Sequence, residues 1–118
     1  MIDPLALGWI LAAHWLSDFL FQPHSIASTK GKSWKALALH IVQYVVCMAL
    51  LTLPLGLGWA FVAWTGALHL ATDAWTARLS GWCYRTERIK PFWVVIGFDQ
   101  LLHGLALVWA LSVCGGAS

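Results

Sequence analysis

The chain has 118 residues, of which 60% are hydrophobic and only 10% are charged, and its mean hydropathy is +0.73. This composition excludes an ordinary water-soluble domain and indicates an integral membrane protein. The formal net charge is only +2, and the sequence carries no nucleic-acid-binding motif and no glycine-rich phosphate loop. We therefore expect membrane lipids as partners and no nucleic acid, and leave homo-oligomer formation open.

Four apolar segments follow one another along the chain, and each is long enough to cross a bilayer as a helix. We predict spans over residues 5–21, 36–53, 57–77 and 92–113. Pro23 follows the first span, a turn at Pro54 makes a tight hairpin of the next two, and Pro91 opens the last. Residues 1–118 are thus expected to form one all-α domain, a membrane-embedded four-helix bundle.

The basic residues predict how the bundle is oriented. All seven Lys and Arg lie in residues 23–35 and 78–91, which we interpret as two loops on one side of the membrane. Because Lys and Arg are retained in cytoplasmic loops, both loops should be cytoplasmic and both termini outside, in a multi-pass protein of the cell inner membrane.

Each predicted span carries polar side chains on one face. His14 and Asp18 are four residues apart, as are His69 and Asp73, and this spacing places each pair on one side of a helix. The other two spans contribute His40 with Tyr44, and Asp99 with Gln100 and His103. With a rise of about 1.5 Å per residue, the ionisable groups fall roughly 6 to 16 Å from the inner helix ends, which is one layer of the inner half of the membrane.

The first and third spans also contain a short internal repeat. Residues 12–18 match residues 67–73 in an Ala, a His, a hydroxyl residue and an Asp, and each copy precedes a span with a further histidine, His40 or His103. Two tandem helical hairpins of like orientation imply a pseudo-twofold axis along the membrane normal. Since the match is short, chance similarity is the alternative.

The aspartates in the polar layer need a counter-charge. An ionised Asp at mid-span costs about 2.5 to 3.5 kcal/mol, so Asp18, Asp73 and Asp99 together would cost of order 7 to 10 kcal/mol. The predicted spans contain no Lys or Arg, which leaves protonated histidines, bound protons or a cation from outside. Imidazoles and carboxylates from facing helices are typical ligands of Zn, Mn or Fe, and we predict a divalent metal held by six residues: His14, Asp18, His40, His69, Asp73 and His103.

Three other interpretations compete with a metal site. The polar groups could only hydrogen-bond across helices, although Ser or Thr would do this at lower cost than three Asp. They could form a path for protons or metal ions in a transporter or channel. Two histidines could instead hold a haem, which would leave the aspartates without a role.

The favoured hypothesis is a metal-dependent hydrolase of a lipid or another membrane-embedded substrate, with the transporter as the alternative. In a hydrolase the metal would activate a water, and Asp99, as a carboxylate outside the ligand set, would be the general base. The residues assigned to substrate binding are Gln22, Lys30, Tyr44 and Gln100.

The sequence resembles one known family over nearly its whole length. The residues that carry the resemblance are the H-x-x-x-D-F-x-x-Q run from His14 to Gln22, Lys30, His40, the His69-x-x-x-Asp73 pair and the D-Q-x-x-H run from Asp99 to His103. They are similar to the domain-of-unknown-function 3307 family of small bacterial and phage membrane proteins. The resemblance implies the membrane topology and supports this choice of polar residues, but it implies no reaction.

Overall fold

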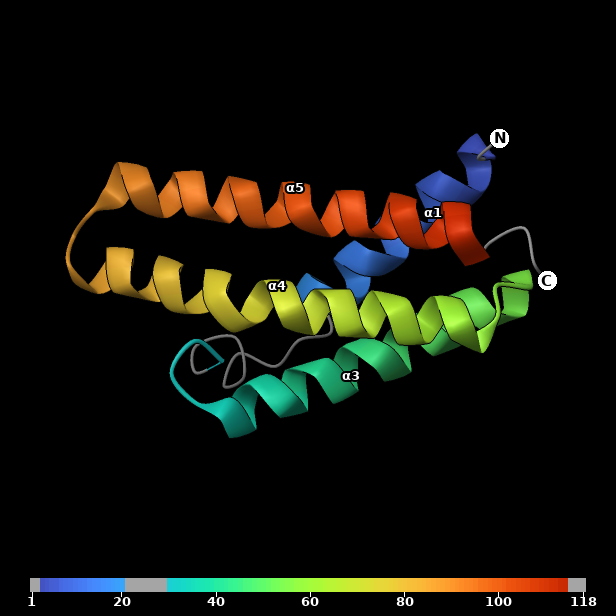
Figure 1. Ribbon diagram of the computed structural model, residues 1–118, viewed down its shortest axis with the longest axis horizontal. Coiled ribbons are helices and arrows are strands. Elements are labelled where there is room, and N and C mark those ends of the chain that lie inside the picture. Colours follow the sequence, from blue (N-terminus) through green and yellow to red (C-terminus); the bar gives the residue numbers. More distant parts are fainter. Residues whose placement is uncertain (1–2, 21–29, 115–118) are drawn as a thin grey trace.

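The computed structural model describes residues 3–20 and 30–114, and in these ranges the chain is helical apart from short turns. The elements are helix α1 (Pro4–Trp15), the π-helical turn η1 (Leu16–Leu20), α3 (Trp34–Thr52), the 3-10 turn η2 (Leu53–Leu55), α4 (Trp59–Arg85) and α5 (Ile89–Cys114) (Figure 1). The all-α prediction is confirmed.

The four long helices form a closed ring of contacts. Helix α4 packs against α3 on one side and α5 on the other, and α1 contacts both α3 and α5. In Figure 1, α3 and α5 run antiparallel to α4, and α1 crosses behind them. The start of α1 and the end of α5 lie at one end of the bundle, and the α4–α5 turn and the start of α3 lie at the other.

The turn between α3 and α4 follows the prediction from its proline and glycines. Pro54 lies in η2, where a proline is tolerated because a short turn needs few amide donors. Gly56 follows in the left-handed conformation, with φ of 86°, which favours a residue without a Cβ atom. Gly58 is the N-cap of α4. The predicted tight hairpin over the second and third segments is confirmed.

The predicted loop over residues 78–91 is wrong. Helix α4 continues to Arg85 and α5 already begins at Ile89, so that only residues 86–88 connect them. Arg78 lies on α4, donates to the Ala74 carbonyl at 2.8 Å and stacks over the Trp34 ring at 3.7 Å. The prediction took the change from apolar to basic residues as the end of the helix. Arg and Leu are both good helix formers, so α4 continues through this change of composition.

The first helix changes its winding before the described part ends at Leu20. A π-helical turn follows α1, where the sequence predicted an uninterrupted α-helix to residue 21. The wider turn brings both Ser17 and Asp18 into the interior, at 0% and 3% exposure. Gln43 of α3 donates to the Ser17 carbonyl at 2.6 Å, which satisfies a backbone acceptor in the π turn.

Apolar side chains cover the outside of the bundle. All nine tryptophans are exposed, the least exposed being Trp109 at 43%. Buried positions include nearly as many polar as apolar side chains. Within residues 3–20 and 30–114, two helical segments, Trp34–Leu55 and Ile89–Cys114, are long and apolar enough to cross a membrane by length and composition. Large apolar side chains therefore cover much of the surface, while polar side chains take up nearly half of the buried positions.

The apolar part of the interior lies in the half of the bundle that contains the η2 turn. Its buried members come from all four long helices and the α3–α4 turn: Ile10, Ala13, Tyr44, Met48, Leu57, Phe61, Leu107, Ala110 and Leu111. We refer to these nine residues as the apolar core. The buried His and Asp side chains continue the interior beyond it, with Tyr44 at the boundary.

Candidate metal centre

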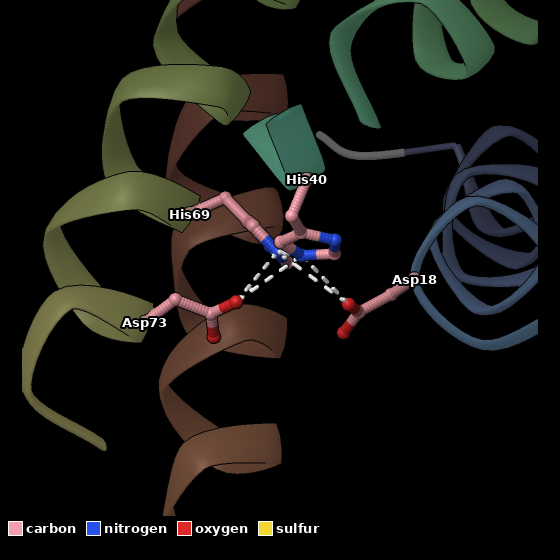
Figure 2. A group of neighbouring side chains, drawn as sticks. All are labelled: Asp18, His40, His69 and Asp73. Carbon is pink, nitrogen blue, oxygen red and sulfur yellow. Dashed lines mark hydrogen bonds and ion pairs between the residues drawn. The ribbon is translucent and has the colours of Figure 1, made fainter. Parts of the chain in front are cut away.

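Four side chains from three elements meet in the interior of the bundle. Asp18 comes from η1, His40 from α3, and both His69 and Asp73 from α4, one helical turn apart (Figure 2). All four are at most 3% exposed. One ligand atom from each lies within 4.8 Å of the others. The predicted convergence of these residues is therefore present in the structure.

The first group of ligand atoms centres on two imidazole nitrogens. His40 Nε2 and His69 Nε2 lie 2.8 Å apart, and Asp18 Oδ1 and Asp73 Oδ2 each lie 3.2 Å from His40 Nε2. The same two oxygens lie 3.5 and 3.3 Å from His69 Nε2. In Figure 2 the carboxylates approach the two rings from opposite sides. Two nitrogens and two oxygens facing one point form a donor set that suits a borderline divalent metal.

The remaining oxygens of the two aspartates face another pair of histidines. Asp18 Oδ2 lies 3.7 Å from His14 Nε2, and Asp73 Oδ1 lies 3.5 Å from His103 Nε2. His14 and His103 are 6% and 2% exposed, and their ring centroids are 5.2 Å apart. All six predicted metal ligands thus belong to one buried cluster.

Asp99 lies at the edge of this cluster. Its Oδ2 is 3.2 Å from His103 Nδ1 and accepts a hydrogen bond from Gln100 Nε2 at 3.0 Å, and its Oδ1 accepts one from the Thr76 hydroxyl at 2.5 Å. Three neighbours therefore fix its orientation. Thr76 was not predicted, although it continues the stripe of His69 and Asp73 by three residues along α4 and could have been found from that spacing.

Lys30 supplies a counter-charge that the sequence did not lead us to expect. Its ammonium lies 3.2 Å from Asp73 Oδ2 and 3.7 Å from Asp18 Oδ1, the two oxygens of the first group. The expectation that only protonated histidines, bound protons or a cation from outside could supply the counter-charge is wrong, because it considered only residues within the predicted spans. The segment before α3 folds back towards α4 closely enough that a Cβ on Gly31 would lie 2.6 Å from the Ala77 carbonyl oxygen.

A cavity of about 650 Å³ leads to the cluster from the end with the α4–α5 turn. Asp18, Asp73 and Asp99 form its inner wall, so the carboxylates of the cluster reach the cavity. The lining includes three basic residues, Lys30, Lys32 and Arg85, and the larger side chains Phe19, Tyr84, Phe92 and Ile96. Most of the cavity surface is apolar, and its charged side chains are these three acidic and three basic residues.

The predicted substrate-binding residues have different locations. Lys30 and Gln100 line the cavity. Tyr44 does not: its ring stacks on His69 at 3.9 Å between centroids, and its hydroxyl contacts His14 Nδ1 at 2.9 Å. The side chain of Tyr44 thus faces the histidines, and its assignment to substrate binding stays a prediction. Gln22 lies outside the described residues.

The geometry of the cluster favours a metal ion over a haem. A haem between two histidines needs space for a porphyrin, whereas His40 Nε2 and His69 Nε2 are 2.8 Å apart and the His14 and His103 rings are close together. A small ion needs only converging donor atoms. Several buried donor atoms of the cluster have no hydrogen-bond partner among the described residues, including His14 Nε2, Asp18 Oδ1 and His103 Nε2. The cluster can hold a metal ion.

A family model matches the chain over residues 6–117 and bears the description protein of unknown function, DUF3307. The chain belongs to this family. The resemblance seen in the His and Asp motifs is therefore confirmed. No curated protein and no solved structure matches the chain significantly.

Proposed function

We propose that this DUF3307 protein is a four-span membrane protein that uses an intramembrane divalent metal centre to hydrolyse a lipid or another membrane-embedded substrate. The observation that carries the proposal is the position of the His and Asp cluster: it is buried in the bundle, and its carboxylates form the inner wall of a cavity with basic and apolar residues.

The membrane location is supported by the outer surface of the bundle. Exposed tryptophans such as Trp15, Trp64 and Trp75 would each be costly in water and are favourable in contact with lipid. The chain termini in this proposal face outward, and the end with Lys30, Lys32 and Arg85 faces the cytoplasm of a bacterial cell at the inner membrane. Anionic lipid head groups would concentrate at that basic end.

The catalytic part of the proposal gives each group a role. Asp18, His40, His69 and Asp73 would hold a divalent ion, which would supply Lewis acidity and lower the pKa of a bound water. Asp99, oriented by Thr76 and Gln100, accepts a proton from the attacking water. The water oxygen bonds to the carbonyl or phosphoryl atom, the ester bond breaks, and the leaving oxygen takes the proton. Lys30 and Lys32 bind the anionic part of the substrate, and metal binding requires Lys30 to move away from Asp73.

The test compares metal content with lipid turnover in purified protein. Asp73→Asn should lose both, because it removes a ligand atom, whereas Asp99→Asn should keep the metal and lose turnover. Selective ion flux in liposomes without any lipid product would contradict the hydrolase and favour a transporter. Wild-type protein that binds no divalent metal would contradict the whole proposal.

Orientation is tested separately by cysteine labelling in intact cells. In a chain without Cys47, Cys83 and Cys114, Lys32→Cys should resist an impermeant reagent and Leu55→Cys should react. Both residues are exposed, and they lie at opposite ends of α3. The reverse labelling pattern would invert the topology and leave the metal chemistry unaffected.

A further inference from the structure

The two carboxylate oxygens of Asp18 face different histidine pairs, and so do those of Asp73. Oδ1 of Asp18 and Oδ2 of Asp73 face His40 and His69. The opposite oxygens of the same aspartates face His14 and His103. A single ion at the first pair would leave two carboxylate oxygens and two histidines of the cluster without an ion.

The internal repeat relates the two histidine pairs to each other. It pairs His14 with His69 and Asp18 with Asp73, and each copy is followed by a helix with one further histidine, His40 or His103. Under this exchange, the set His40, His69, Asp18 and Asp73 becomes the set His103, His14, Asp73 and Asp18. The contacts between helices follow the same exchange: α1 with α3 corresponds to α4 with α5, and α1 with α5 corresponds to α4 with α3.

Three pairs of distances in the structure agree with this relation, whereas the His40–Asp73 and His69–Asp18 contacts of 3.2 and 3.5 Å have no counterpart among the ion pairs of the described residues. The His40 and His69 centroids are 5.0 Å apart, and those of His14 and His103 are 5.2 Å apart. The His40 Nε2 to Asp18 Oδ1 distance of 3.2 Å corresponds to the His103 Nε2 to Asp73 Oδ1 distance of 3.5 Å. The His69 to Asp73 contact of 3.3 Å corresponds to the His14 to Asp18 contact of 3.7 Å.

The second pair also has the outer contacts that metal-bound histidines usually have. His14 Nδ1 is within hydrogen-bond distance of the Tyr44 hydroxyl, at 2.9 Å, and His103 Nδ1 lies 3.2 Å from the Asp99 carboxylate. Contacts at Nδ1 orient the rings so that Nε2 is the nitrogen available to an ion. His14 Nε2 and both ring nitrogens of His103 are buried without a hydrogen-bond partner among the described residues, so that the His103 Nδ1 contact with Asp99 is an ion-pair approach only.

From these observations we infer that the protein holds two divalent cations, the second between His14 and His103, with Asp18 and Asp73 bridging it to the first. This inference rests on the proposed metal centre and extends it. Carboxylates that bridge two ions, with histidines completing each ion's ligand set, are an established way of building two-metal centres in helical bundles. Such a pair can stabilise both the attacking and the leaving oxygen of a hydrolysis.

The test uses Mn²⁺ as the probe, on the full chain purified without metal and then reloaded. Wild type should bind two Mn²⁺ per chain and give the electron paramagnetic resonance spectrum of a coupled pair. The double variant His14→Ala with His103→Ala should bind one Mn²⁺ with an uncoupled spectrum, and so should its matched counterpart, His40→Ala with His69→Ala. Asp18→Asn should lose the coupling and weaken both sites.

The outcomes separate this inference from the proposed function. One uncoupled Mn²⁺ in wild type would overturn the second site and leave the first centre in place. Two Mn²⁺ in the His14 and His103 variant would show that these histidines are not ligands. No bound Mn²⁺ in wild type would remove the proposed metal centre itself. If a double variant does not fold, the wild-type stoichiometry and spectrum still decide.

Discussion

The two halves of the bundle interior are built from different side chains. The apolar core fills the half with the η2 turn, where Met48, Phe61 and Ala110 are fully buried. The other half contains His, Asp and Thr, which interact through nitrogen and oxygen atoms about 3 Å apart. Packed apolar side chains gain dispersion energy without a desolvation cost. A buried charged group loses its hydration, and its ion-pair and hydrogen-bond partners must compensate for that loss before it stabilises the fold. We therefore expect the apolar core to determine stability and the polar half to determine metal binding.

The largest effect is expected where the polar half loses a bridging carboxylate. Asp73→Asn should lower divalent metal affinity by more than about 100-fold, since loss of an outer contact to a ligand already costs about 10–100-fold. Mn²⁺ titration in detergent measures this. The matched control on the same helix is Thr76→Ser, a change at a buried position that keeps the hydroxyl beside Asp99. Unchanged affinity in Asp73→Asn would break the assignment of metal binding to this half.

The complementary change in the apolar core is Phe61→Ala. Phe61 is fully buried, so its truncation should cost about 3–5 kcal/mol of unfolding free energy. Titration with a denaturing detergent measures the loss. Phe98→Ala is the control, because this ring is 46% exposed on the outside and its loss should change stability by about 0.5 kcal/mol or less. Equal losses in the two variants would contradict the location of the core.

Tyr44→Phe tests the boundary between the halves. The ring stacking on His69 remains, but the hydroxyl beside His14 Nδ1 is lost, so metal affinity should fall about 10–100-fold with little change in stability. Tyr84→Phe removes the same hydroxyl from a side chain that is 65% exposed and should have no effect on affinity. A large loss of stability with unchanged affinity would assign Tyr44 to the apolar core alone.

Gly31→Ala tests how closely the segment before α3 must approach α4. The added Cβ would lie 2.6 Å from the Ala77 carbonyl oxygen, and because that oxygen belongs to a helix backbone, the segment with Lys30 must move. We expect a stability loss of about 1–3 kcal/mol. Gly97→Ala is the matched control, since its Cβ would meet no atom within 4 Å. A stability equal to that of Gly97→Ala would contradict the close approach.

The smallest expected effect is a gain. Lys30→Gln should raise divalent metal affinity about tenfold, or about 1.4 kcal/mol, because the ammonium competes for Asp73 Oδ2 and Asp18 Oδ1. Lys35→Gln removes the same charge from an exposed position at the start of α3 and controls for the general charge effect. Equal affinities in the two variants would show that Lys30 does not compete with the ion.

The sequence alone determined the helices and the members of the buried cluster. His14 with Asp18, and His69 with Asp73, share a face because an α-helix has 3.6 residues per turn, which is a local property. The cost of ionisable groups in an apolar segment then predicts that these faces point inward. The prediction of a loop over residues 78–91 failed, because a change from apolar to basic composition does not mark where a helix ends.

Only the tertiary structure decided which atoms meet. The π turn at Asp18, the approach of Gly31 to α4 and the crossing of α1 behind the other helices fix the contacts of Lys30 and Tyr44. They also direct the two oxygens of each bridging aspartate to different histidine pairs. Apart from the pairs four residues apart within one helix, these contacts join residues 12 (Lys30 and Asp18) to 51 (Asp18 and His69) positions apart. Their distances depend on helix crossing and packing, which no local periodicity determines.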